Sequence, residues 1–277
     1  VEGTVTNVAD SADDNNKVTT VVIKNAAGTE TNGQYKTITL VPGALKITKR
    51  GAGETKVTLT AADNTVTYDG QAHGAKLNAA GEIEVGTSYT ITNLAEGHSV
   101  QTVAIDGSET NVGEYPGKLV PNGEVIVDKD GNDVTENYEV THVNGKLTIT
   151  SPDTVTVTIR GNKDTVEYNG QKHEVNSYEV VSISNTLYTE ADFGFADGAT
   201  AHAEGTDAGD YFMNLTKDSF VNKNGNFTSV TFVVEDGKLT ITKRGLDEKN
   251  LVKIIAANNS VYYDGQPHGA RLNDKDE

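Results

Sequence analysis

Apolar and polar residues alternate along several short stretches of the chain. Threonine separates Val57 from Leu59, and the same alternation links Val155, Val157 and Ile159. A period of two places apolar side chains on one face of an extended strand and hydroxyl groups on the other. The abundance of Thr, Val, Asn, Asp and Gly favours strands and tight turns over helices. The pattern therefore predicts half-buried β-strands and an all-β fold.

Asx-Gly dipeptides lie between these stretches. Asn and Asp followed by Gly tolerate the positive φ angles of two-residue hairpin turns. We therefore predict a tight turn at each of five dipeptides: Asp69-Gly70, Asn144-Gly145, Asn169-Gly170, Asp236-Gly237 and Asp264-Gly265.

Three sequence motifs recur in a fixed order. The motif Tyr-Asx-Gly-Gln-x-His begins at Tyr68, Tyr168 and Tyr263, which are spaced at 100 and 95 residues. The motif Gly-x-Leu-x-Ile-Thr begins at Gly43, Gly145 and Gly237, and Asx-x-Gly-x-Tyr lies between the other two at 111–115 and 207–211. Recurrence of several motifs at one period is the signature of tandem modules.

The modules are of two alternating types. Residues 61–78 match residues 256–273 at 13 of 18 positions, whereas the copy between them diverges soon after His173. The final fragment is too short to fold as a full module. The predicted division is residues 1–50 as the C-terminal part of a B-type repeat, 51–150 as a complete A-type repeat, 151–244 as a complete B-type repeat, and 245–277 as the N-terminal part of a further A-type repeat.

Two all-β folds fit a module of this length. Asp207-Ala-Gly-Asp-Tyr211 has the spacing of a tyrosine corner, which favours tandem Ig-like β-sandwich modules. The segments 189–193 and 216–220 each begin with a threonine and have an acid within the next two residues, so each could start a helical turn. A β-grasp-like module with one short helix is therefore the alternative.

Charge and composition exclude several classes of partner. The 23 Lys and Arg against 40 Asp and Glu give a net charge of −17, which repels nucleic acid and anionic membrane surfaces and disfavours self-association. We expect a monomer whose partners are neighbouring repeats of the same chain. The chain has no cysteine and no apolar run long enough to span a bilayer, so we expect neither disulfides nor membrane insertion in this segment. Because it opens and closes inside a repeat, we expect it to be a piece of a longer protein.

The three motifs together resemble the YDG and MBG repeat families, which form long tandem arrays in large surface proteins of Gram-positive and gut-dwelling bacteria. Asn169 departs from the plain motif, and the first partial repeat lacks a clean Asx-x-Gly-x-Tyr. The resemblance implies an extracellular stalk or spacer of an adhesin-like protein with a cell-wall-anchored parent, in which stacked modules project a distal binding domain. It brings no catalytic residues. It also implies an alternative, a module that binds host glycans or proteins.

The candidate metal ligands are histidines and side chains that carry oxygen atoms. His73, His173 and His268 are one repeated position, for which we predict a hydrogen bond to nearby backbone. A loop of alternating oxygen side chains is the candidate calcium site, although a solvated hairpin turn is the favoured interpretation. The residues of this candidate calcium site are Asp128, Asp130, Asn132, Asp133 and Glu136. Apart from calcium we predict no cofactor.

An aromatic cluster is confined to the B-type repeat. Tyr188, Phe193 and Phe195 have no counterpart in the A-type repeat. Core packing is the favoured role, and an exposed ligand patch for sugar rings or a protein partner is the alternative. The sequence has no nucleophile elbow and no phosphate-binding loop, so we predict that the chain is not an enzyme.

Overall fold

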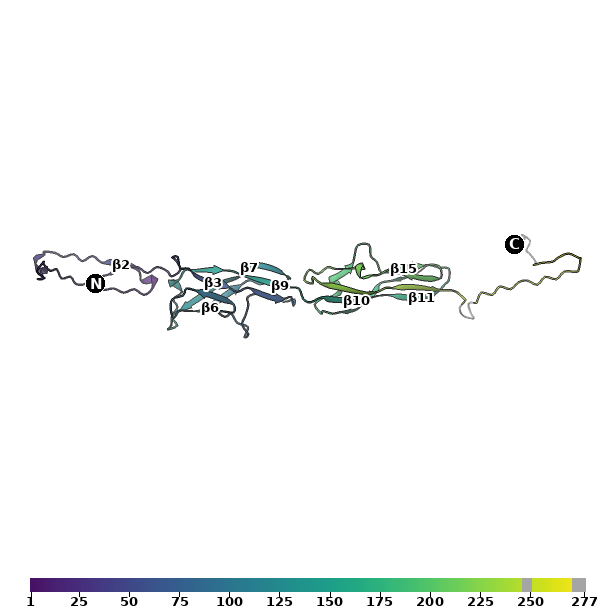
Figure 1. Cartoon of the computed structure of the whole chain (residues 1–277), viewed down its shortest axis with the longest axis horizontal. Helices are drawn as coiled ribbons and strands as arrows, with labels where there is room; N and C mark the ends of the chain where they lie inside the picture. Colours follow the sequence, from purple (N-terminus) through teal and green to yellow (C-terminus); the bar gives the residue numbers. More distant parts are fainter. Residues whose placement is uncertain (246–250, 271–277) are drawn as a thin grey trace. The chain divides into compact units, whose positions relative to one another are not determined.

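The computed structural model describes residues 1–245 and 251–270 and contains no α-helix within them (Figure 1). The chain divides into two compact units. The first comprises residues 1–153 together with the short segment 225–228, and the second comprises residues 154–224 and 229–277. The all-β prediction is confirmed, with several small sheets in each unit.

The A-type repeat lies in the first unit and forms two sheets with the strand orders β5-β3-β8 and β4-β9-β7-β6. Its strands are β3 (Val57–Ala61), β4 (Asn64–Thr67), β5 (Tyr89–Thr92), β6 (Ser99–Asp106), β7 (Gly113–Val127), β8 (Val140–Val143) and β9 (Gly145–Thr150).

The B-type repeat forms the sheets β13-β10-β18 and β11-β19-β16, with the smaller pairs β12-β15 and β14-β17. Its strands are β10 (Val155–Gly161), β11 (Lys163–Glu167), β12 (His173–Asn176), β13 (Tyr178–Ile183), β14 (Phe193–Phe195), β15 (His202–Gly205), β16 (Gly209–Phe212), β17 (Phe220–Asn222), β18 (Val230–Glu235) and β19 (Lys238–Thr242).

In both repeats the first two strands lie parallel to the last two. β3 and β4 pair in parallel with β8 and β9, and β10 and β11 pair in parallel with β18 and β19. The flanking partners of these strands, such as β13 and β16, are antiparallel.

Burial follows the alternation read from the sequence. Val57, Leu59 and Ala61 of β3 are buried and the intervening threonines are only partly covered. Strands β10 and β19 show the same alternation. Leu147 and Ile149 of β9 complete one core cluster of the A-type repeat with Ala61 and Leu119. Alternate apolar positions therefore supply the cores, as predicted.

The five Asx-Gly dipeptides adopt two different structures. Gly70, Gly170 and Gly265 have φ angles of +82°, +77° and +78°, so the expected positive-φ turns form there. The turns at Gly70 and Gly170 do not close hairpins, because the strands on either side of them, such as β11 and β12, pair with other strands.

The predicted turns at Asn144-Gly145 and Asp236-Gly237 are wrong. The offset between parallel partners is 83 residues both before and after Gly145, so β8 and β9 run on along β3 and β4 without a reversal. A Cβ atom at Gly145 would lie 2.7 Å from the carbonyl oxygen of Ala62, and one at Gly237 would lie 2.7 Å from that of Asn162. Glycine is needed there for close backbone approach and not for a turn.

The two segments that could have formed a short helix form single 3-10 turns, η4 (Glu190–Asp192) and η5 (Lys217–Ser219). The Asp192 carboxylate accepts hydrogen bonds from the Thr189 amide at 2.7 Å and from its hydroxyl at 2.9 Å. The capping chemistry is present, but the helix of the β-grasp alternative is not found among the described residues.

The two ends of the chain contain little regular structure. In residues 1–50, β1 (Ala12–Asn16) pairs with β2 (Gly43–Leu45). Residues 251–270 contain no strand and are exposed. Within the described part of the chain, no helix has the length and apolar character needed to cross a membrane.

Candidate functional site

The Tyr-Asx-Gly-Gln-x-His motif forms the same turn three times. Asp69 Oδ1 accepts a hydrogen bond from the Gln71 amide and lies 2.8 Å from His73 Nε2. The corresponding distances from Asn169 Oδ1 and from Asp264 Oδ1 are all 2.9 Å. The histidine partner is therefore the Asx side chain, and the predicted bond to backbone is wrong.

This turn favours the ionised form of Asp69. The hydrogen bond from the Gln71 amide, followed by that from the His73 side chain, lowers the pKa of the Asp69 carboxyl. The same geometry at Asn169 carries no charge, so the turn depends on an oxygen acceptor and not on an anion. The motif thus has a structural role in each copy.

We expect Asp69→Asn to leave this turn intact, because Asn169 already supports it in the B-type repeat. Asp69→Ala removes the acceptor for both the Gln71 amide and the His73 ring, so the Gln71 amide should exchange faster with solvent. Amide hydrogen exchange measured by NMR on both variants checks this. Equal exchange of the Gln71 amide in the two variants would contradict the assigned role.

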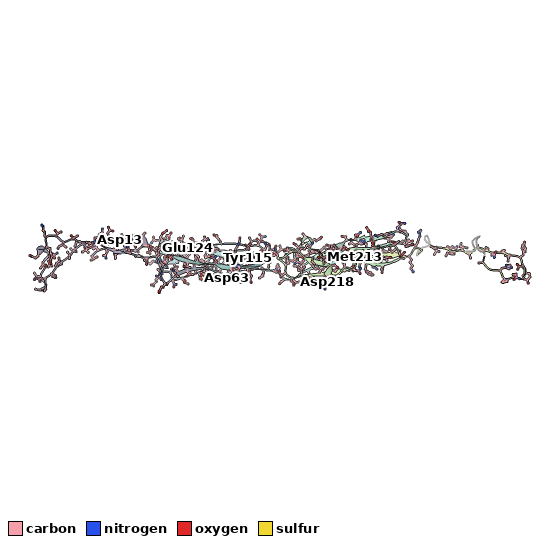
Figure 2. All side chains as sticks on the ribbon, turned by 90° about the horizontal axis from the view of Figure 1, so that it is seen from above. Asp13, Asp63, Tyr115, Glu124, Met213 and Asp218 are labelled. Atoms are coloured by element: carbon pink, nitrogen blue, oxygen red, sulfur yellow. The ribbon has the colours of Figure 1, made fainter. Side chains whose placement is uncertain are left out.

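The tyrosine corner is confirmed and occurs in both complete repeats. The Tyr115 hydroxyl, on the side chain labelled in Figure 2, donates to the Asn111 carbonyl at 2.8 Å. The Tyr211 hydroxyl donates to the Asp207 carbonyl at 2.9 Å. The Asx-x-Gly-x-Tyr motif therefore closes on itself in both repeats.

The acidic loop proposed as a calcium site is a tight turn. Asp128 Oδ1 accepts hydrogen bonds from the amides of Asp130 and Asn132, each at 2.9 Å. Asp133 Oδ1 accepts from the Thr135 amide at 2.9 Å and from its hydroxyl at 2.6 Å. Hydrogen bonds from Asn132 to Asp128 and from Thr135 to Asp133 lower the pKa of each carboxyl.

The B-type repeat forms a comparable turn without acids. Asn222 Oδ1 accepts from the Asn224 amide at 3.0 Å, in the way that Asp128 accepts from Asp130. Because an amide oxygen can replace the carboxylate here, this geometry favours the turn over a cation site. Of the other predicted calcium ligands, Asp130 pairs with Lys129 at 2.7 Å, and Glu136 lies in the 3-10 turn η3 (Thr135–Asn137).

The aromatic cluster of the B-type repeat lies mostly in its core. Tyr188 is 2% exposed and Phe193 is 4% exposed, and their rings stack with centroids 6.2 Å apart. Phe195 is 37% exposed but packs against Tyr178 and Phe220. Two of the three rings cannot contact a ligand without unfolding, so the cluster is not an exposed binding platform.

The Tyr188 hydroxyl is buried with this ring. It lies 3.0 Å from the Asp192 carbonyl oxygen and 2.9 Å from Asn222 Oδ1. Burial, followed by the nearby charge of Asp192, raises the pKa of Tyr188 to about 12. The hydroxyl links three segments of the repeat and remains protonated at neutral pH.

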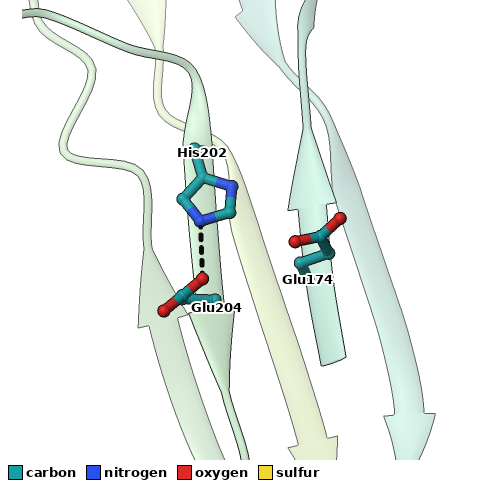
Figure 3. Close-up of side chains that lie close together, drawn as sticks. All are labelled: Glu174, His202 and Glu204. Atoms are coloured by element: carbon teal, nitrogen blue, oxygen red, sulfur yellow. Dashed lines mark hydrogen bonds and ion pairs between the residues drawn. The ribbon is translucent and has the colours of Figure 1, made fainter. Parts of the chain in front are cut away.

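Three ionisable side chains converge on the face of the β12-β15 pair (Figure 3). Glu174 on β12 is the register partner of Glu204 on β15, and His202 lies two residues before Glu204. His202 Nε2 is 2.9 Å from Glu204 Oε2, and its Nδ1 is 2.6 Å from Asn176 Oδ1. Together the cluster offers one imidazole and two carboxylates within 4.8 Å of one another.

One imidazole and two carboxylates are a donor set suited to zinc, but Lys172 already lies in this cluster. Lys172 Nζ is 2.5 Å from Glu204 Oε2. Its hydrogen bond, followed by that from His202, lowers the pKa of Glu204. Carboxylates directly opposite each other in a sheet repel, and Lys172 provides a compensating positive charge. The cluster is best described as a surface ion-pair network.

Sequence reasoning missed this cluster. The alternation Glu174-Val-Asn176 and His202-Ala-Glu204 shows that each pair shares one face of a strand. Neither stretch shows that β12 pairs with β15, which begins 29 residues after β12 begins.

A cavity of about 470 Å³ lies in the first unit. Its volume falls within the range of small-molecule sites, but its polar lining is engaged in internal hydrogen bonds. Among the lining residues, His98 Nδ1 lies 2.7 Å from the Tyr138 hydroxyl, Asn137 contacts Asn7, and Asp128 forms the turn described above.

The fold and these sites define a modular all-β repeat protein. The side chains of its repeated motifs form hydrogen bonds within its own turns and tyrosine corners. Residues 153–243 match the family model described as "MBG domain". The resemblance to MBG-type repeats is thereby confirmed for residues 153–243, which lie in the B-type repeat. No curated protein and no solved structure matches the chain.

Proposed function

We propose that the chain is a spacer segment of a bacterial surface protein, in which successive repeats hold a distal binding domain away from the cell. The MBG match supports a repeat module of a surface protein. The protein would be extracellular, anchored to the wall of a Gram-positive bacterium, monomeric, and in contact mainly with its own neighbouring repeats.

The observation that carries the proposal is what the side chains of the repeated motifs contact. The histidine of the first motif binds the Asx side chain of its own turn, and the tyrosine of the second binds its own backbone. In the two complete repeats, the leucine and isoleucine of the third are buried in the cores. Repetition thus preserves a fold and not a reactive group, which favours a non-catalytic, structural role.

A binding role through the aromatic residues of the B-type repeat is the second function considered from the sequence. Burial of Tyr188 and Phe193 removes the observation that favoured it. The spacer function is therefore the better supported of the two.

Small-angle X-ray scattering of the chain with and without calcium tests the proposal. Four segments of about 30 Å in line, as strands of this length imply, would give a radius of gyration of roughly 35 Å. A compact protein of this length would give about 19 Å. We expect the larger value and no change with calcium, since the Asp128 loop is already closed by its own hydrogen bonds.

A radius of gyration near the compact value would contradict the spacer function. A change of profile on addition of calcium would instead indicate a cation-regulated hinge. The matched control is Asp128→Asn, which copies Asn222 and should leave both profiles unchanged.

A further inference from the structure

Asn137 makes a two-point contact with residues far away in the sequence. Its side-chain oxygen accepts a hydrogen bond from the Val8 amide at 2.7 Å, and its side-chain nitrogen donates to Asn7 Oδ1 at 2.8 Å. A carboxamide carries an acceptor oxygen and a donor nitrogen on one planar group, so a single side chain can make both bonds.

The same contact occurs a second time within the first unit. Asn226, in the segment 225–228 that belongs to this unit, accepts a hydrogen bond from the Val112 amide at 2.8 Å. Its side-chain nitrogen donates to Asn111 Oδ1 at 3.1 Å. Asn7-Val8 and Asn111-Val112 are thus bound in the same way by an asparagine of a later segment.

An aromatic residue follows each of these asparagines. Tyr138 follows Asn137, Phe227 follows Asn226, and both rings are buried. The Phe227 ring lies edge-on to Tyr68 with centroids 5.6 Å apart. Tyr68 in turn packs on the core cluster of the A-type repeat. The contact at Asn111 therefore joins a polar two-point interaction to an aromatic one, which makes it specific in geometry as well as in chemistry.

We name the two partners by their residues. The Asx site is an Asx-x dipeptide bound in this way, as in Asn7-Val8 and Asn111-Val112; in the A-type repeat it includes Tyr68, the tyrosine that begins the Tyr-Asx-Gly-Gln-x-His motif. The Asn–aromatic pair is the dipeptide that binds it, as in Asn226-Phe227 and Asn137-Tyr138. Two of the three repeated motifs contribute to an Asx site.

We propose that Asp207, Ala208 and Tyr168 form a further Asx site, and that its partner is the Asn–aromatic pair of another A-type repeat. Asp207 and Ala208 are exposed, and no described residue accepts a hydrogen bond from the Ala208 amide. Tyr168 is 37% exposed, whereas the equivalent Tyr68 is covered in part by Phe227.

The chemistry of this site fits the same partner. The Asp207 carbonyl accepts the Tyr211 hydroxyl, as the Asn111 carbonyl accepts that of Tyr115, so the two dipeptides have matching backbone positions. The Ala208 amide would donate to the asparagine oxygen, and the Asp207 carboxylate would accept from its nitrogen. A carboxylate acceptor strengthens that bond. An aspartate in place of the asparagine would be repelled.

The order of repeats identifies the partner. Residues 256–273 repeat the start of the A-type repeat, so the repeat that follows Asp207 along the chain is of the type that carries Asn137-Tyr138. This inference rests on the proposed spacer function and deepens it, because it states which residues join one repeat to the next.

The first test uses the 277-residue chain. The double substitution Asn111→Asp with Val112→Ala copies the Asp-Ala dipeptide of the B-type repeat into the position that Asn226-Phe227 already binds. We expect the amide at position 112 to stay protected from hydrogen exchange, and Asn226→Asp added to this variant should speed its exchange at least about fivefold. Asn137→Asp is the matched control and should release the Val8 amide alone.

The second test identifies the partner. The chain is continued after residue 273 with residues 79–150 of its own sequence, which completes a further A-type repeat. We expect the Ala208 amide to become protected at least about fivefold. The substitution Asn137→Asp in the appended copy should abolish that protection while the Ile241 amide, in the core of the same repeat, stays protected.

Loss of protection at position 112 in the double variant would overturn the proposal, because an Asp-Ala dipeptide would then not bind an Asn–aromatic pair. An Ala208 amide that exchanges equally with and without the appended repeat would overturn the choice of partner. If the appended repeat does not fold, the double variant alone decides. None of these outcomes depends on the scattering profile, so the spacer function is tested separately.

Discussion

Leu239→Ala is expected to lower the free energy of unfolding of the second unit by about 3 kcal/mol, the usual cost of emptying a leucine site in a packed core. Leu239 is fully buried on β19, between β11 and β16. For a repeat of about 100 residues this corresponds to a fall of roughly 12 to 24 °C in Tm. Differential scanning calorimetry of the whole chain measures it.

Two control variants make this result specific. Val233→Ala changes a residue of β18 that is 51% exposed, so the Tm should stay nearly unchanged. Leu147→Ala empties the equivalent site of the A-type repeat and should lower the transition of the first unit instead. A Leu239→Ala chain with an unchanged thermogram would show that β19 does not form the core.

Alkaline pH is expected to destabilise the second unit through Tyr188. The folded protein raises the pKa of this hydroxyl to about 12, and the unfolded chain has a value near ~10. A raised folded pKa contributes stability that is fully present below pH ~10 and is lost as the pH rises through about 12. The loss amounts to at most about 3 kcal/mol.

Urea unfolding at pH 9 and pH 11.5 measures this loss. Tyr188→Phe is the control, because it removes the titrating group and should flatten this part of the pH dependence. The same variant loses the hydrogen bonds to Asp192 and Asn222, so it should be less stable at pH 9 by about 1 kcal/mol. A Tyr188→Phe chain with the same pH dependence as the parent would assign the effect to other groups.

Sequence reasoning predicted the strands well wherever the local pattern and the fold impose the same requirement. The alternation around Leu59 predicted a strand with one buried face, and β3 has that face in the core. The spacing of Asp207 and Tyr211 predicted a corner, because the bond spans only four residues. Features that close within a few residues can be predicted from composition and spacing.

The remaining features depend on partners that are distant in the sequence. Gly70 and Gly145 both follow an Asx residue, yet one is needed for a positive φ and the other for close approach to Ala62. Nothing in the dipeptide distinguishes these requirements, because only the second involves another strand. The ion-pair cluster around His202 was missed for the same reason, since it requires the register between β12 and β15.

The parallel pairing of the first and last strands determines how each repeat would carry a tensile load. In such a pair the chain enters at one end of the joined strands and leaves at the other. A pull on both ends therefore shears the whole row of hydrogen bonds between β10–β11 and β18–β19 at once, from Val155 with Val230 to Glu167 with Thr242. Bonds loaded in shear must break together, whereas bonds loaded in a hairpin open one by one. A repeat built in this way can resist extension under flow without any covalent crosslink.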